Sequence, residues 1–122
     1  MSNNNNNFFK PRGSTSGLNH QNALSNELLQ TNLKVIDGNS ECSRLNYDPN
    51  KNYCCKDSNE NRNSVICFGD SGGPLMFYDK NGKWYIYGLT SYTVGSCMNK
   101  YPTFFTKVPS FLDWIGNAIA NL

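Results

Sequence analysis

Six consecutive residues, Gly69 to Pro74, constrain this chain more than any other part of it. They read Gly-Asp-Ser-Gly-Gly-Pro, a run that would arise by chance with a probability on the order of 10⁻⁷ per position. Three glycines and a proline around one serine favour a tight turn, because glycine adopts positive φ freely and proline interrupts helices and strand interiors. Such a turn can hold the Ser71 hydroxyl forward while nearby backbone N–H groups point into the same space. This geometry suits an acyl-transfer nucleophile with its oxyanion hole, whereas an incidental serine in a glycine-rich loop is the disfavoured interpretation.

Three segments that follow this loop in the sequence each resemble a segment of one protein family. Gly88–Tyr92 is similar to the Gly-Ile-x-Ser-Trp strand of the chymotrypsin/trypsin family of serine endopeptidases. Pro102–Val108 resembles the family's Pro-Gly-Val-Tyr-x-x-Val segment, and Phe111–Ile115 resembles its closing helix. The resemblance runs from about Gly13 to Leu122 and covers only the second half of a complete protease.

The resemblance implies an all-β fold, an antiparallel β-barrel of the six-stranded type with a C-terminal α-helix. This barrel would be the second barrel of a chymotrypsin-like fold, and we expect it to be incomplete. Residues 13–122 would form the barrel domain. Residues 1–12 are predicted to be a disordered tail, because a polar, Asn-rich tract cannot bury enough apolar surface to fold. Within that tail Phe8 and Phe9 give only a weak strand signal.

Composition excludes several classes of partner. The chain has 122 residues, a net charge of +2 and 16% charged residues, which is too weak a field to attract nucleic acid or a membrane surface. No apolar run approaches the roughly 20 residues that a membrane-spanning helix needs. Five cysteines favour an oxidising compartment, yet the polar start is not a secretory signal. We therefore expect the complete protein to be extracellular, with its true N-terminus absent from this sequence.

Hydrophobic periodicity predicts strands at 28–36, 75–78, 83–92 and 103–108. For the first of these the pattern alone is split between helix and strand, and the resemblance decides for a strand. The dipeptide Asn81–Gly82 predicts a hairpin turn between the second and the third. After the last strand an apolar stripe at helical spacing, with Ser110 and Asp113 as a capping box, predicts a helix packed on the barrel. Between residues 37 and 64 only a long polar connection is expected.

The resemblance also implies two disulfides. Cys67 would pair with Cys97, which would tie the Ser71 loop to a later loop, and Cys42 would pair with Cys54 or, second, with Cys55. The remaining cysteine of the doublet would then be unpaired, or bonded to a part of the protein outside this sequence. Metal binding by the doublet is disfavoured because no histidine or second Cys-x-x-Cys pair accompanies it. No metal and no cofactor are expected.

The family resemblance assigns roles to the Ser71 loop. Ser71 would be the nucleophile, and the N–H groups of Gly69 and Ser71 would bind the oxyanion. Asp70 would pair with a new N-terminal ammonium that proteolytic activation releases. Because the chain has no Ile-Val-Gly-Gly-like segment to supply that ammonium, we expect Asp70 to be turned away or solvated and the oxyanion hole to be partly formed. A plain turn aspartate is the alternative.

The catalytic base is the largest gap. A serine hydroxyl is a poor nucleophile at neutral pH unless an imidazole accepts its proton. His20 is the only histidine, and it lacks the Ala-Ala-His-Cys surround of the family's catalytic histidine, so we expect an exposed loop residue. The family's histidine and aspartate both lie in the first barrel, which this sequence does not contain.

Five positions correspond to the family's substrate pocket and substrate-pairing strand: Val65, Ser91, Tyr92, Thr93 and Thr103. Val65 would stand where trypsin-like members carry an aspartate, and without that charge a buried basic side chain would be unpaired. Thr93 and Thr103 would narrow the pocket, which favours a small aliphatic residue before the scissile bond. The backbone from Ser91 to Thr93 would pair with an extended polypeptide substrate. If the domain cleaves nothing, Tyr92 and Thr93 are ordinary barrel residues.

The sequence therefore predicts a fragment of a serine endopeptidase, a hydrolase that needs a missing N-terminal barrel for its histidine and aspartate. Alone, this chain is predicted to be inactive, because it lacks that histidine and aspartate. It is also predicted to be poorly soluble, because a half-protease exposes an apolar face. The alternative is a non-catalytic, protease-like binding module. An unrelated disulfide-rich domain is the third hypothesis.

Overall fold

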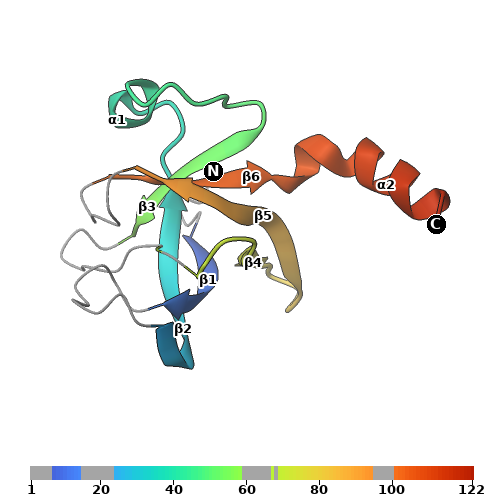
Figure 1. Ribbon diagram of the computed structural model, residues 1–122, viewed down its shortest axis with the longest axis horizontal. Helices are drawn as coiled ribbons and strands as arrows, with labels where there is room; N and C mark the ends of the chain where they lie inside the picture. The colour runs from blue at the N-terminus through green and yellow to red at the C-terminus, as the bar shows by residue number, and fades with distance from the viewer. Residues whose placement is uncertain (1–6, 15–23, 59–66, 68, 95–100) are drawn as a thin grey trace.

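The computed structural model describes residues 7–14, 24–58, 67, 69–94 and 101–122. One antiparallel sheet closes into a barrel with the strand order β1-β2-β3-β6-β5-β4 (Figure 1). The strands are β1 (Asn7–Ser14), β2 (Leu24–Val35), β3 (Asn52–Asp57), β4 (Pro74–Tyr78), β5 (Trp84–Thr93) and β6 (Thr103–Lys107). The helical elements are α1 (Ser40–Ser43), the 3₁₀ helix η1 (Val108–Phe111) and α2 (Leu112–Ala120). The predicted antiparallel barrel with a C-terminal helix is confirmed.

Strand β1 overlaps the segment predicted to be a disordered tail. Residues 7–12 pair with β2 in one continuous register, from Asn7 opposite Lys34 to Arg12 opposite Leu29. The prediction of disorder is therefore wrong for residues 7–12, because composition describes the Asn-rich start but not a partner strand about twenty residues downstream. Residues 1–6 lie outside the described part of the chain.

The barrel is closed by a short ladder between β1 and β4. Among the described residues, the ladder between β1 and β4 contains one pair, Phe9 opposite Met76, whereas β1 and β2 share a long register. Within the described ranges, the incompleteness expected from the sequence corresponds to this one-pair seam between β1 and β4.

Strand β3 lies within the stretch for which the sequence predicts only a polar connection. It pairs with β2 through Val35 and Cys55, and with β6 through Cys54 and Phe104. Neighbouring residues of a strand point to opposite faces, so the cysteine doublet is divided between two environments. Pairing on both sides, which no local pattern shows, makes this polar segment a strand.

Two buried clusters lie on the two faces of β3. Cys54 forms a disulfide with Cys42 of α1, which confirms the favoured pairing, and the bridge packs with Phe104. Cys55 has a free thiol and is fully buried with Leu33, Leu75 and Phe105 in the barrel interior. Burial excludes a bond from Cys55 to an outside partner, and the disulfide of its neighbour excludes a metal site at the doublet.

The predicted hairpin between β4 and β5 is present. Gly82 has a φ of +81°, a left-handed conformation that suits glycine. The Asp79 carboxylate accepts hydrogen bonds from the N–H groups of Asn81 and Lys83, at 2.8 and 2.9 Å. A short turn with an aspartate that bonds to its own backbone therefore joins the two strands.

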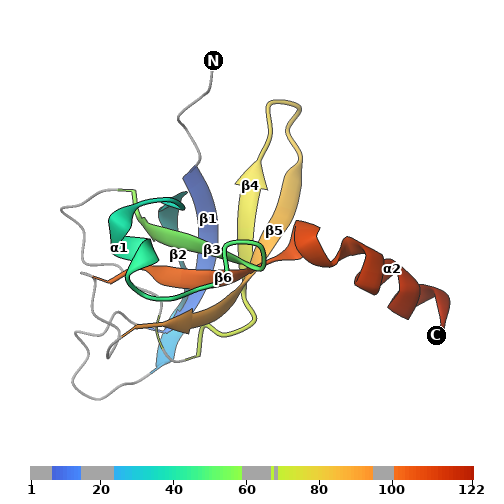
Figure 2. The same cartoon turned by 90° about the horizontal axis from the view of Figure 1, so that it is seen from above.

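The C-terminal helix forms where it was predicted but does not pack as predicted. Figures 1 and 2 show α2 extending away from the barrel, and no residue of the helix is buried. The exposed fractions of Leu112 and Trp114 are 59% and 70%. The predicted capping box is absent, since Ser110 lies in η1 and its hydroxyl donates to the Asn50 carbonyl at 2.6 Å. An apolar stripe predicts which face of a helix can be buried, but it does not show that another part of the protein packs against that face.

Within the described ranges, no helix has the length and apolarity required to cross a bilayer.

Candidate active site

The described residues of the Ser71 loop, 67 and 69–74, contain two successive turns, each closed by a backbone hydrogen bond. In the first, the Asp70 N–H donates to the Cys67 carbonyl at 3.1 Å. In the second, the Gly73 N–H donates to the Asp70 carbonyl at 3.0 Å. Ser71 is the second residue of the second turn, and it is exposed. The motif therefore holds the serine on a bend whose two ends are hydrogen-bonded.

A glycine with positive φ occupies the third position of each turn. The φ angles are +92° at Gly69 and +79° at Gly72. Other L-residues adopt such angles only with strain, and a turn with positive φ at its third position requires glycine or asparagine. These angles explain two of the three glycines that flank Ser71. Gly69, a predicted oxyanion-hole residue, is exposed beside the serine.

Asp70 lies in a different environment from the one expected. Its exposed fraction is 2%, and Oδ2 accepts a hydrogen bond from the Cys67 N–H at 2.8 Å. Of the two expected states, turned away or solvated, the solvated carboxylate is wrong, because the first turn folds the side chain back over its own backbone. Asp70 thus joins Cys67 through both its N–H and its carboxylate, as a turn aspartate does.

Strand β5 holds the second half of the loop through Thr90. The Thr90 carbonyl accepts from the Gly72 N–H at 2.9 Å, and the Thr90 N–H donates to the Gly73 carbonyl at 2.9 Å. The Thr90 hydroxyl also donates to the Gly73 carbonyl, at 3.1 Å. This role of Thr90 was not predicted from the sequence. A threonine within a predicted strand was the available signal, because its hydroxyl needs a partner once the strand buries it.

The predicted substrate residues of β5 and β6 lie together. Ser91 and Tyr92 are exposed and directly follow Thr90. Thr93 is opposite Thr103 across the β5–β6 ladder, and Thr103 is buried with an exposed fraction of 6%. The structure therefore brings four of the five predicted pocket residues to one end of the strand pair that supports the Ser71 loop. The fifth, Val65, lies outside the described residues.

Tyr92 has a fixed orientation. Its ring stacks on that of Phe104, with 4.7 Å between the centroids and 15° between the planes. Phe104 is fully buried and packs in the cluster that contains the Cys42–Cys54 disulfide. Partial burial raises the pKa of the Tyr92 phenol, so this ring is uncharged at neutral pH. The disulfide thus supports, through one intermediate ring, the exposed aromatic face beside Ser91.

Several predicted residues fall outside the described part of the chain. Cys67 is disulfide-bonded, but its predicted partner Cys97 lies outside the described residues, and the pairing stays a prediction. His20 also lies outside them. In the ranges that the structure describes, no group of three or more histidine, cysteine, aspartate or glutamate side chains could hold a metal ion.

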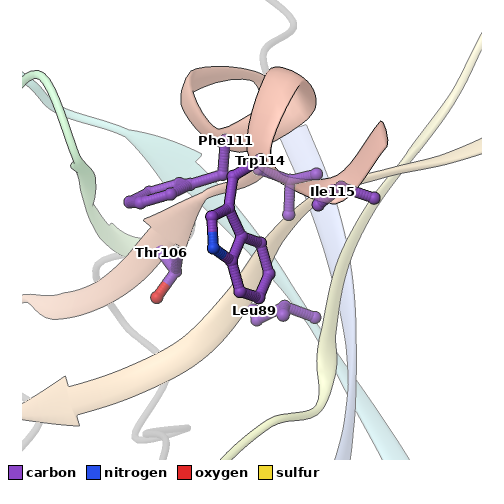
Figure 3. Close-up of a pocket in the computed structure, with 6 residues that line it drawn as sticks. Leu89, Thr106, Phe111, Trp114 and Ile115 are labelled. Carbon is purple, nitrogen blue, oxygen red and sulfur yellow. The ribbon is translucent and has the colours of Figure 1, made fainter. Parts of the chain in front are cut away.

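A second surface feature lies beside α2. An apolar groove of about 350 Å³ is lined by Leu89, Thr106, Val108, Phe111, Trp114 and Ile115. Figure 3 shows the Trp114 side chain pointing from the helix toward Leu89 of β5. The groove is open to solvent at Trp114, which is 70% exposed, and at Leu89, which is 39% exposed. Leu89 immediately precedes Thr90, so one strand serves both the groove and the Ser71 loop.

Comparisons with known proteins agree with this geometry. A sequence model of the family described as Trypsin matches residues 5–115, which include strand β1. Chymotrypsin-C of Rattus norvegicus is 35% identical over 100 residues, 76% of this chain and 36% of the relative. Human chymotrypsin-like elastase family member 3B is 35% identical over 103 residues, 80% of this chain and 37% of the relative. Proproteinase E of Bos taurus is 46% identical over 57 residues, 45% of this chain and 22% of the relative.

The chain spans little more than a third of the length of the first two of these relatives. The family model nevertheless covers more than half of this chain, and the Ser71 loop, the strand that holds it and the C-terminal helix follow one another in the order that the resemblance implies. The chain belongs to the trypsin family of chymotrypsin-like serine proteases.

Proposed function

We propose that this chain is the C-terminal lobe of a serine endopeptidase whose histidine and aspartate come from a second lobe. The observation that carries the proposal is the position of Ser71. It is exposed within the second of two glycine-containing turns, on a loop that Thr90 hydrogen-bonds to the barrel. That arrangement, together with the family, supports a nucleophile rather than an incidental loop serine.

In the proposed reaction, Ser71 Oγ attacks the carbonyl carbon of the scissile peptide bond while the imidazole of the second lobe accepts its proton. The N–H groups of Gly69 and Ser71 donate to the oxyanion of the tetrahedral intermediate. The C–N bond then breaks, the amine leaves with the proton from the imidazolium, and Ser71 is left as an ester. Water, deprotonated by the same imidazole, hydrolyses that ester and returns the proton to Ser71.

The second lobe is required because this chain offers no suitable base. His20 is the only histidine in the sequence, and its neighbours do not resemble those of a catalytic histidine. Without a base the serine hydroxyl stays protonated and weakly nucleophilic. We therefore propose that the chain alone is inactive.

Asp70 is the proposed partner of the ammonium group that activation creates. A buried carboxylate needs compensation by hydrogen bonds or a cation, and the Cys67 N–H supplies one such bond. Formation of the ion pair would engage the carboxylate with a charged donor. The turn that carries the Gly69 N–H would change with it, because Asp70 closes that turn.

The pocket supports a preference for small aliphatic residues before the scissile bond. Thr93 and Thr103 face each other across the ladder, and their β-branched side chains would shorten the pocket. Tyr92 offers a stacked aromatic face next to the Ser91 backbone, against which an extended substrate would lie. We propose polypeptide substrates and no cofactor.

The exposed apolar surface supports a partner lobe. Leu89, Leu112 and Trp114 are more than a third exposed, and Leu89 and Trp114 also line the apolar groove beside α2. An N-terminal barrel that covers this surface would supply the two missing catalytic residues at the same time. The disulfide and the family support an extracellular location for the complete protein.

The test is a chimera in which this chain replaces the matching C-terminal part of the human relative named above, which supplies the other lobe. After activation, a fluorophosphonate probe should label Ser71 in the chimera and should leave the isolated chain unlabelled. The variant Ser71→Ala of the same chimera is the matched control and should take no label.

Each outcome is informative. A folded chimera that takes no label would favour the alternative, a non-catalytic binding module. Strong labelling of the isolated chain would contradict the need for a second lobe. Labelling of Ser71→Ala would show that another nucleophile reacts.

A further inference from the structure

We infer that the hydroxyl of Thr90 is a positioning group for Ser71. The inference rests on the proposed function and names a residue that the family motif leaves variable, since the family pattern that Gly88–Tyr92 resembles has no fixed residue there. Thr90 does not contact the reacting atoms. It would act through the backbone of the two glycines that follow the serine.

The contacts of Thr90 converge on that dipeptide. Its carbonyl and N–H bond to Gly72 and Gly73 at 2.9 Å each, which extends the β4–β5 ladder beyond its first pair, Pro74 with Leu89. The hydroxyl then adds a second donor, at 3.1 Å, to the Gly73 carbonyl. Both lone pairs of this carbonyl can therefore be used.

The second donor, the Thr90 hydroxyl, matters because the residue that it binds belongs to a pair of glycines next to Ser71. Gly72 and Gly73 have no side chains, so packing cannot fix their backbone, and Gly72 already has a φ of +79°. A residue with free φ and ψ transmits motion to its neighbour, which is Ser71. A donor on a buried residue of β5 restrains the peptide plane that contains the Gly73 carbonyl, and the N–H of Ser71 lies three peptide planes before it.

The burial of Thr90 makes the hydroxyl a fixed donor. Its exposed fraction is 7%, and its ladder partner, Phe105, is fully buried. The β-branched side chain has few rotamers in a strand. The hydroxyl is thus held by packing and does not depend on water.

The test compares Thr90→Val, which removes the hydroxyl at nearly constant shape, with Thr90→Ser, which keeps the hydroxyl. Thr106→Val is the control, because it makes the same chemical change on the neighbouring strand β6, where Thr106 lines the apolar groove instead (Figure 3). Two measurements are made on each variant, hydrogen–deuterium exchange of the isolated chain and fluorophosphonate labelling of the activated chimera.

In Thr90→Val, amide exchange of residues 69–73 should become about three to ten times faster, the size expected for the loss of one net hydrogen bond. Exchange of the other strands should not change. Thr90→Ser and Thr106→Val should exchange like the parent chain. Unchanged exchange in Thr90→Val, or equally faster exchange throughout the barrel in Thr90→Val and Thr90→Ser, would overturn the inference.

In the chimera, Thr90→Val should label about three to ten times more slowly, should lower kcat on a peptide substrate by a similar factor, and should leave KM unchanged. Thr90→Ser should restore the rate. A rise in KM at constant kcat would point to a role in the pocket and overturn the positioning role. If even the parent chimera takes no label, the proposed function fails, while the exchange data still decide whether the Thr90 hydroxyl restrains the loop.

Discussion

The Ser71 loop and the C-terminal helix α2 contrast in how the rest of the molecule supports them. Residues 67 and 69–73 of the loop belong to no helix or strand, yet hydrogen bonds close both of its turns, Thr90 of β5 binds it, and Asp70 is buried within it. The helix is regular along its length, yet none of its residues is buried. Regular backbone geometry is therefore no guide to tertiary support, which depends on what lies on the other side of each residue.

The largest expected difference is between two apolar side chains, one next to the loop and one on the helix. Leu75 directly follows the loop and is fully buried, so Leu75→Ala should lower the free energy of unfolding by about 2–5 kcal/mol. Trp114 is 70% exposed, so Trp114→Ala should change it by less than about 0.5 kcal/mol. Urea unfolding of the two variants measures both values.

This pair can also break the comparison. If Trp114→Ala costs as much as Leu75→Ala, the apolar face of α2 is covered in solution, by a second copy or by the barrel itself. Reduced binding of a hydrophobic dye by Trp114→Ala, at unchanged stability, would instead sharpen the comparison, because it would show that the helix face is open.

A second pair compares the same substitution in the loop and in the helix. A Cβ at Gly72 or at Gly116 would meet no atom within 4 Å. Neither alanine substitution should therefore cause a steric clash, and any difference in stability reflects the backbone conformation. Gly72 has a φ of +79°, and alanine there should cost about 1–2 kcal/mol in backbone strain. Gly116 lies inside α2, where alanine should stabilise the protein by about 0.5–1 kcal/mol.

Thermal unfolding should therefore shift in opposite directions for Gly72→Ala and Gly116→Ala. Equal shifts would mean that the loop relaxes to a conformation that accepts a side chain. In that case the two glycine turns would not be the reason for the motif.

The smallest expected effect concerns pH and the core beneath the loop. Burial raises the pKa of the Cys55 thiol well above its ordinary value of 9.0. The unfolded chain then releases this proton at a lower pH than the folded chain, so stability is complete below pH 9 and falls as the pH rises above it. The loss should reach about 1 kcal/mol by pH 10.

Cys55→Val is the control for this effect, since it keeps an apolar side chain of similar size and removes the thiol. The stability of the parent chain relative to Cys55→Val should decrease between pH 8 and pH 10. A constant difference over this range would show that the thiol titrates normally and that the core beside Leu75 admits water.

Much of the site could be predicted from local sequence. The Gly-Asp-Ser-Gly-Gly-Pro run predicts a tight turn, and the two positive φ angles explain why glycines flank Ser71. The pairing of Cys42 with Cys54 was the favoured choice and is confirmed. The Asn81–Gly82 turn was equally readable. These features depend on a few adjacent residues or on a strong resemblance, and no distant contact is needed to find them.

The errors share one physical cause. Residues 7–12 and β3 look like polar, unstructured sequence, and they become strands because β2, β3 and β6 offer backbone partners far away in the chain. Asp70 was expected to be turned away or solvated; the solvated state is wrong, because the fold of its own turn buries the carboxylate. In each case the outcome depends on a hydrogen-bond partner or on burial that the local sequence pattern does not specify.

The sequence by itself determined the turn around Ser71, the apolar strands, the helix and the family, because backbone preferences and hydrophobic spacing are properties of neighbouring residues. Only the tertiary structure decided that β1 closes the barrel, that Cys54 and Cys55 face opposite sides, and that Thr90 holds the two glycines after the serine. Those outcomes depend on hydrogen bonds and burial between segments distant in sequence. Such contacts exist only once the chain has folded.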